Sequence, residues 1–295
     1  MHVSSDKDRI GLVVANPYKK DGRVLVGKAT NFSSLKEGIL HSVDLIGGFN
    51  RGIQRGDEVL LKPNFNTADL PPGSSDPDFV KAVIELLFEH GAKKVVLGES
   101  SMLRLSTRKV LKETGMLKKA EEAGAEVIPF DECTWKKVAT GGKYLKNVSL
   151  PETALGSQKV VYTCCMKTHR FAKFTFSLKL AVGFMKPSER MQLHMRHLEE
   201  KVSDLNLVVH PHLIIMDGRK CFISGGPATG DLRNPGLVLA SGDRVALDVE
   251  ALKTVAAFET SSLRNDPWSY TQVRRAAELG LGVKNNEEYK VVADD

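Results

Sequence analysis

The chain has 295 residues, a formal net charge of +6 and a sequence pI near 9.0. Its hydrophobic fraction of 42% and charged fraction of 26% are typical of a globular protein and exclude disorder over most of the length. Basic and acidic residues are mixed along the chain, so a nucleic-acid-binding surface is not favoured despite the positive charge. We expect one α/β domain over residues 1–295, with an inserted lobe within about residues 131–205.

The apolar segments and the cysteines indicate the compartment. No apolar run reaches about 18 residues, so no membrane-spanning helix and no membrane partner are expected. The polar segment 1–9 lacks the apolar centre of a signal peptide. Cys133, Cys164, Cys165 and Cys221 have no zinc or cluster spacing. Cys164 and Cys165 are adjacent and lie in an apolar run, which predicts that these two are buried, reduced thiols. We therefore predict a reducing, cytoplasmic location.

Short apolar runs alternate with amphipathic stretches, which predicts an α/β fold with a layered, mostly parallel central sheet and helices on both faces. The apolar runs predict strands at 10–15, 58–61, 94–97, 126–130, 159–166, 212–216 and 237–240. The other segments predict helices at 35–46, 76–91, 107–114, 187–205, 243–255 and 266–280. The clearest helix start is Asp76 before Pro77, because Asp caps helices and Pro suits the first helical position. The helix from Pro187 would carry Met191 and Met195 on its apolar face.

Polar residues follow one predicted strand after another at its carboxyl end. They are Lys62 and Asn64, Glu99 and Ser100, Lys167 and His169, Asp217, and Asp243. In open α/β sheets the strand ends and the helix N-termini meet in one crevice, and helix N-termini favour anions. Lysines would add full positive charges. The sequence therefore predicts a pocket for a small anion, either a carboxylate or a phosphate.

His169 is a candidate for proton transfer because the ordinary pKa of histidine is about 6.5. Lys167 and Asp217 are the other predicted catalytic residues. The alternatives are a histidine bonded to a loop carbonyl and a lysine that is simply solvated. Gly225 and Gly226 are predicted to contact a phosphate through backbone N–H groups, although a turn that needs positive φ explains these glycines equally well.

Asp248 falls on the inward face of its predicted helix, where a carboxylate needs a partner, and we expect Lys62 or Lys179. His194 falls on the apolar face of its helix, which favours a packed core histidine over a ligand. No local HExxH, EF-hand or two-His-one-carboxylate pattern is present, so no metal ligands are predicted and the cofactor stays unidentified.

Taken in order, these motifs resemble the family known as domain of unknown function 362, over roughly residues 57–257. The resemblance is carried by Lys62-Pro63-Asn64, Asp76-Pro77, Gly98-Glu99-Ser100, Lys167-Thr168-His169, Lys179, Asp217-Gly218, Gly225-Gly226-Pro227, and Gly242-Asp243 with Asp248. It implies the fold and the shared polar residues, but it supplies no reaction. The family pattern has Lys-Asn where this chain has Lys179-Leu180, so the role of that asparagine does not carry over.

The leading hypothesis is an enzyme that acts on a small anionic metabolite. His169 would transfer a proton, while Asp217 and Asp248 would orient the basic groups or hold a metal. The predicted substrate-binding residues are Lys62, Asn64, Glu99, Ser100, Lys179, Gly225, Gly226, Asp243 and Asp248.

The alternative is a non-catalytic accessory protein of redox metabolism with a ferredoxin-like partner. It follows from the family, many members of which carry ferredoxin-type iron–sulfur modules, whereas this chain has no CxxCxxC run. A concave pocket in which the lysines, the histidine and an acid converge would favour the enzyme. A homo-oligomer is left open.

Overall fold

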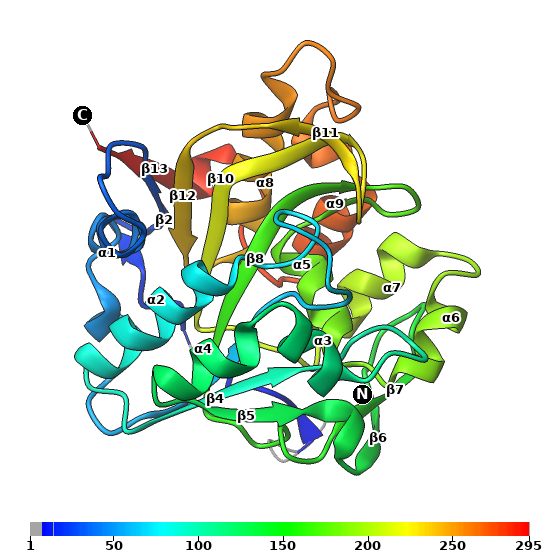
Figure 1. Ribbon diagram of the computed structural model, residues 1–295. Coiled ribbons are helices and arrows are strands. Elements are labelled where there is room, and N and C mark those ends of the chain that lie inside the picture. Colours follow the sequence, from blue (N-terminus) through cyan, green and yellow to red (C-terminus); the bar gives the residue numbers. More distant parts are fainter. Residues whose placement is uncertain (1–7, 14, 295) are drawn as a thin grey trace.

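The computed structural model describes residues 8–13 and 15–294. An eleven-stranded sheet has the strand order β1-β2-β12-β10-β8-β3-β4-β5, with β11 paired to β10, β13 to β2 and β9 to β8 (Figure 1). Its strands are β1 (Lys19–Lys20), β2 (Arg23–Ala29), β3 (Glu58–Lys62), β4 (Lys94–Glu99), β5 (Glu126–Pro129), β8 (Lys159–His169), β9 (Lys173–Thr175), β10 (Leu213–Gly225), β11 (Gly230–Arg233), β12 (Leu237–Ser241) and β13 (Tyr289–Ala293). The helices are α1 (Leu35–Asp44), α2 (Pro77–Glu89), α3 (Thr107–Glu113), α4 (Met116–Glu122), α5 (Ser177–Leu180), α6 (Arg190–Leu193), α7 (Leu198–Leu205), α8 (Arg244–Ala256) and α9 (Thr271–Glu278).

The centre of the sheet is parallel. Strands β5, β4, β3, β8 and β10 pair in parallel with their neighbours, whereas β12 and β2 continue the sheet in antiparallel pairs. This arrangement confirms the predicted α/β class with a mostly parallel central sheet. It also places the carboxyl ends of β3, β4 and β8 next to one another at one edge.

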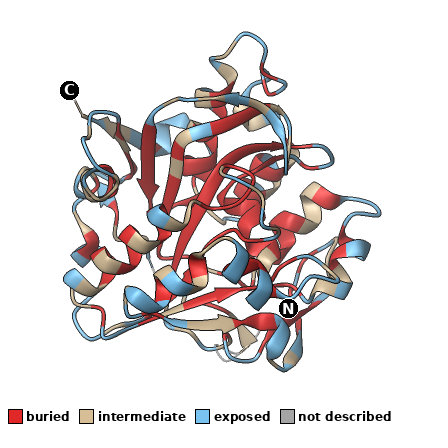
Figure 2. Cartoon of the chain, in the orientation of Figure 1, coloured by how far each residue is buried: buried red, intermediate tan, exposed pale blue. Residues whose placement is uncertain are grey.

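Helices cover both faces of the sheet because the strand side chains alternate between two apolar clusters. On β3, Leu60 belongs to the cluster that includes α5, α7, α8 and α9, whereas Val59 and Leu61 belong to the cluster that includes α1 to α4. Strand β8 alternates in the same way, with Val160 on the first face and Val161 on the second. The central strands are therefore buried on both faces, as Figure 2 shows.

The predicted first strand is wrong. Ile10 forms only an isolated bridge to Val209. Gly11 has a φ of +81°, and a Cβ there would lie 2.1 Å from the carbonyl oxygen of His210, so the chain turns instead of extending. Val14, which also falls in the predicted strand, lies outside the described residues. Strand β2, which pairs with β12, β1 and β13, was not predicted.

The single helix predicted from Pro187 is also wrong. The segment forms two short helices, α6 and α7, separated by His197, whose φ of +54° cannot continue a helix. Met191 and Met195 are 67% and 78% exposed, so they are not part of an apolar face. This break changes the direction of the chain beside the carboxyl edge of the sheet.

Two strands are longer in the structure than the sequence predicts. Strand β8 continues to His169 and β10 continues to Gly225, so Lys167, His169 and Asp217 lie within strands and not after them. A separate antiparallel pair, β6 (Trp135–Ala139) and β7 (Asn147–Pro151), lies within the segment for which an inserted lobe is predicted. That lobe stays a prediction.

Cys164, Cys165 and Cys221 are buried, Cys133 is half-buried, and all four are free, which confirms the expectation of buried thiols for the adjacent pair. Within residues 8–13 and 15–294, no helix has the length and apolar character needed to cross a bilayer.

Candidate functional site

A polar cavity of about 120 Å³ lies at the carboxyl ends of β3, β4 and β8. We call it the strand-end cavity. Helices α5 and α6 and the loop after α5 complete its wall. Its polar lining residues are Lys62, Asn64, Asn66, Glu99, Ser100, Lys167, His169, Thr175, Lys179, Arg190 and His194. The structure thus brings together seven of the residues that the sequence analysis selected: Lys62, Asn64, Glu99, Ser100, Lys167, His169 and Lys179.

A buried ion pair joins β3 to β4 at the base of this cavity. Lys62 Nζ lies 2.6 Å from Glu99 Oε1 and donates a second hydrogen bond, also of 2.6 Å, to the carbonyl oxygen of Pro63. Glu99 also accepts hydrogen bonds of 2.7 Å from the backbone N–H groups of Phe65 and Ser100. Both charges are therefore satisfied within the protein, and the pair holds the two strand ends together.

Gly183 is required by the position of Lys62. A Cβ at residue 183 would lie 2.4 Å from Lys62 Nζ, so no larger residue fits without moving the ammonium. The ring of the next residue, Phe184, lies 5.7 Å from Lys62 Nζ, within the range of a cation–π contact. The loop after α5 is therefore shaped by the buried ion pair.

Lys179 differs from the other two lysines of the cavity. Lys167 Nζ donates to the carbonyl oxygen of Gly73, and Lys62 is paired with Glu99. Among the described residues, Lys179 Nζ has no hydrogen bond or ion pair, although the side chain is only 9% exposed. Burial, with added repulsion from Lys167 and Arg190, lowers the pKa of Lys179 to about 7.

Asp248 positions the helix that carries Lys179. Its carboxylate accepts hydrogen bonds from the backbone N–H and the hydroxyl of Ser177, at 2.9 and 2.6 Å, and from the N–H of Leu178, at 3.0 Å. The predicted pairing of Asp248 with Lys62 or Lys179 is therefore wrong, because the first turn of α5 supplies the partners. Burial raises the pKa of Asp248 to about 7, although these hydrogen bonds oppose the shift.

The backbone fixes the tautomer of His169. Its Nδ1 accepts hydrogen bonds of 3.1 Å from the N–H groups of Phe171 and Ala172. In the neutral ring the proton must then lie on Nε2, which becomes a donor. Burial, together with the charges of Lys179 and other basic neighbours, lowers the pKa of His169 to about 2, so the ring is neutral near pH 7.

His194 has the opposite tautomer. Its Nδ1 lies 2.7 Å from the carbonyl oxygen of Arg190, which can only accept, so Nδ1 carries the proton and Nε2 has a free lone pair. The rings of His194 and His169 lie 6.2 Å apart. The expectation of a packed core histidine at residue 194 is wrong, because the side chain is exposed and lines the cavity. One neutral histidine can thus donate a hydrogen bond and the other can accept a proton.

Arg190 was missed by the sequence analysis. Its buried guanidinium donates to the carbonyl oxygens of Gly183, Met185 and Ser101, at 3.0 to 3.2 Å, and so ties α6 to the loops around it. Burial lowers its pKa to about 10. No sequence pattern predicts this role, because the acceptors are backbone carbonyl groups, which any residue type carries.

Two buried hydroxyl groups in the wall have no partner among the described residues, namely those of Ser100 and Thr175. An unpaired buried hydroxyl is costly unless something bonds to it. Asn64 lines the same wall, and its backbone N–H donates to Ser75 Oγ at 2.9 Å. Polar groups are therefore available on more than one side of the cavity.

Asp217 is not brought to the strand-end cavity. Its carboxylate accepts hydrogen bonds of 2.9 and 2.6 Å from Arg219, which also donates to Asp76 at 2.8 Å. It lines a separate space of about 50 Å³ beside Cys165.

The glycine-rich loop is a hairpin turn between β10 and β11. Gly225 and Gly226 have φ values of +77° and +64°. A Cβ on Gly226 would lie 2.0 Å from the carbonyl oxygen of Thr168. Of this loop, only Pro227 lines the strand-end cavity. The turn geometry accounts for both glycines.

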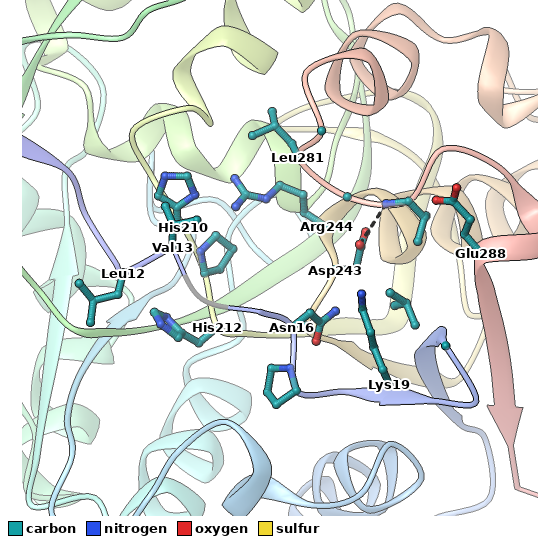
Figure 3. A pocket seen from close by; sticks show the side chains of 18 residues that line it. Leu12, Val13, Asn16, Lys19, His210, His212, Asp243, Arg244, Leu281 and Glu288 are labelled. Carbon is teal, nitrogen blue, oxygen red and sulfur yellow. Dashed lines mark hydrogen bonds between the residues drawn. The ribbon is translucent and has the colours of Figure 1, made fainter. Parts of the chain in front are cut away.

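Asp243 lies in a different and larger cavity of about 570 Å³ at the amino end of β10, which Figure 3 shows from close by. Its buried charged groups, Asp243 and Arg244, are bonded within the protein, whereas Lys19 in the same lining is exposed. Asp243 caps α8 through the N–H groups of Val245 and Ala246, both at 2.9 Å, and accepts from Val283 at 3.1 Å. Arg244 donates to the carbonyl oxygen of Val209 at 2.8 Å. We therefore take the strand-end cavity, despite its smaller volume, as the candidate functional site.

No group of three or more His, Cys, Asp or Glu side chains within residues 8–13 and 15–294 is arranged to hold a metal ion. Nitrogen donors dominate the strand-end cavity, and its one lining carboxylate, Glu99, is paired with Lys62.

The fold and the cavity define an α/β protein with a cation-lined cavity at the carboxyl edge of a parallel sheet. Residues 59–253 match the family model described as Domain of unknown function (DUF362), and the chain belongs to this family. The thylakoid-associated protein sll1697 of Synechocystis sp. is 27% identical over 270 residues, which cover 89% of this chain and 80% of that protein. No solved structure matches the chain.

Breaking the buried ion pair is expected to destabilise the protein strongly. Lys62→Met leaves the Glu99 carboxylate buried without its cation, which should lower the free energy of unfolding by about 3–5 kcal/mol. The measurement is denaturant unfolding followed by circular dichroism. Adding Glu99→Gln should restore part of the loss, because the amide oxygen still accepts backbone hydrogen bonds without a charge.

The matched control is Lys94→Met, which removes an exposed lysine that lies 2.6 Å from Glu126. Its unfolding midpoint should stay that of the wild type, because solvent screens such pairs. Equal effects of the two lysine substitutions would contradict the role given to Lys62.

Proposed function

We propose that the chain is an enzyme that binds a small carboxylate or phosphate metabolite in the strand-end cavity and moves a proton on it. The observation that carries the proposal is the buried Lys179 side chain, whose nitrogen has no partner among the described residues. A buried cation without a counterion is costly, and an anionic ligand would remove that cost.

The charge balance of the cavity supports an anion as the ligand. Lys167 and Lys179 have no carboxylate partner among the described residues, and Glu99 is already occupied by Lys62. The Nε2–H of His169 adds a neutral donor to the same wall. A volume of about 120 Å³ suits an anion of a few heavy atoms and is well below the roughly 300 Å³ of larger ligand pockets.

The two histidines support proton transfer as the chemistry. Geometry gives His169 a donor nitrogen and His194 an acceptor nitrogen. Burial of His169 and partial burial of His194 lower the pKa of both rings, so each is neutral near pH 7. In that state His169 donates a hydrogen bond and His194 can accept a proton. Neither role requires Asp217.

Sulfate, whose charge is constant over the range tested, is a direct probe of anion binding. The affinity should be highest below pH about 7 and fall about tenfold per unit above it, because the Lys179 ammonium loses its proton there. Isothermal titration calorimetry from about pH 6 to about pH 9 measures this. Lys179→Met should bind sulfate about 10–100-fold more weakly at pH about 6, and its affinity should depend less on pH than that of the wild type.

The control for this experiment is Lys118→Met, since the side chain of Lys118 is 83% exposed. It should bind sulfate as the wild type does at every pH. Sulfate binding that is absent, or equal in the Lys179→Met protein, would contradict anion binding in the cavity.

Proton transfer can be followed with pyruvate, which has a carboxylate and an acidic C–H next to its carbonyl. In heavy water the protein should accelerate exchange of the methyl hydrogens, measured by proton NMR. His194→Gln should slow the catalysed exchange by about 100-fold or more, the usual contribution of a general base. The partly exposed His41 on α1, which is not among the residues that line the cavity, supplies the control His41→Gln, which should exchange normally. No acceleration by the wild-type protein would refute the chemistry.

A further inference from the structure

Lys179 is surrounded by basic groups on the elements that pack around it. Strand β8 supplies Lys167 and His169, and helix α6 and its C-terminal cap supply Arg190 and His194, all lining the same cavity. Lys62 on β3 is also present, but its charge is balanced by Glu99 on β4. Among the described residues, no carboxylate is left in the cavity to hold Lys179 in the ammonium form.

This environment makes Lys179 a free amine at a pH where other lysines are charged. Its pKa of about 7 follows from burial and from the repulsion of Lys167 and Arg190. At pH about 8 roughly nine-tenths of such a lysine is neutral, against less than about one part in a hundred for an ordinary lysine. A desolvated lysine next to another cation is the usual form of an amine nucleophile in enzymes.

We propose that Lys179 forms a Schiff base with the carbonyl group of a short oxo acid. The inference rests on the proposed function and names its substrate class. The substrate carboxylate would be held by the Lys167 ammonium and the Nε2–H of His169, and the carbonyl carbon would face Lys179 Nζ. The hydroxyl groups of Ser100 and Thr175, two residues of the same wall, lack partners among the described residues.

The step balances without an oxidant or a reductant. The lone pair of neutral Nζ forms a bond to the carbonyl carbon, and the C=O π electrons move to oxygen. The oxygen then leaves as water, with one proton from the amine and one from solvent. The product is an iminium ion that keeps one N–H and a positive charge, which suits a site next to a bound carboxylate.

The test traps the iminium ion by reduction. The full chain is incubated with pyruvate and sodium borohydride at pH about 8, and the modified lysines are located by peptide mass spectrometry. Lys179 should carry the reduced adduct at least about tenfold more than the exposed Lys118, because its free-amine fraction is far larger. Sulfate should suppress labelling, and acetone, which lacks a carboxylate, should label Lys179 weakly.

The variant K179R keeps a cation but cannot form the iminium ion, so the cavity adduct should be absent. The inference would be overturned if, in the wild type, lysines are labelled according to their exposure and Lys179 is not labelled. This result does not depend on the stability of the variant. If sulfate still binds in that case, the Schiff base alone fails; if sulfate also does not bind, the proposed function fails with it. Equal labelling by pyruvate and acetone would refute the oxo-acid class.

Discussion

The buried contact between Lys62 and Glu99 is the interaction on which the candidate site depends. It joins the ends of two parallel strands. Glu99 also accepts hydrogen bonds from the backbone N–H groups of Phe65 and Ser100, in the loops that follow these strands. A charge pair at this depth needs hydrogen bonds besides the opposite charge, and here Lys62 donates two and Glu99 accepts three. The requirement for glycine at residue 183 extends the same constraint to the loop after α5.

The lysines of the cavity differ in whether their charge is balanced within the protein or can bind a ligand. One lysine of the cavity is neutralised within the protein, and another donates to the backbone at Gly73. Lys179 is left, on a short helix whose first turn is held by Asp248 from α8. The polar residues of this region therefore have different tasks: some build the wall, and others are available to a ligand.

The sequence predicted the parallel sheet and the convergence of its strand-end residues, because buried strands and the polar residues at their ends are local patterns. The prediction was wrong where contacts between distant segments determine the local structure. The predicted long helix is broken at His197, and Arg190 and His194, which precede the break, line the cavity. The Asp248 carboxylate accepts hydrogen bonds from the backbone of α5 and does not pair with a lysine. No periodicity or spacing in the sequence predicts either outcome.

The central claim is that the unpaired cations of the strand-end cavity bind an anion. The most direct measurement is a crystal structure of the protein with selenate, an analogue of sulfate whose selenium is located by anomalous scattering. We expect the strongest selenium peak in the strand-end cavity, within hydrogen-bond distance of the nitrogens of Lys167 and Lys179. A strongest peak in the larger cavity beside Asp243, or no peak near Lys179, would contradict it.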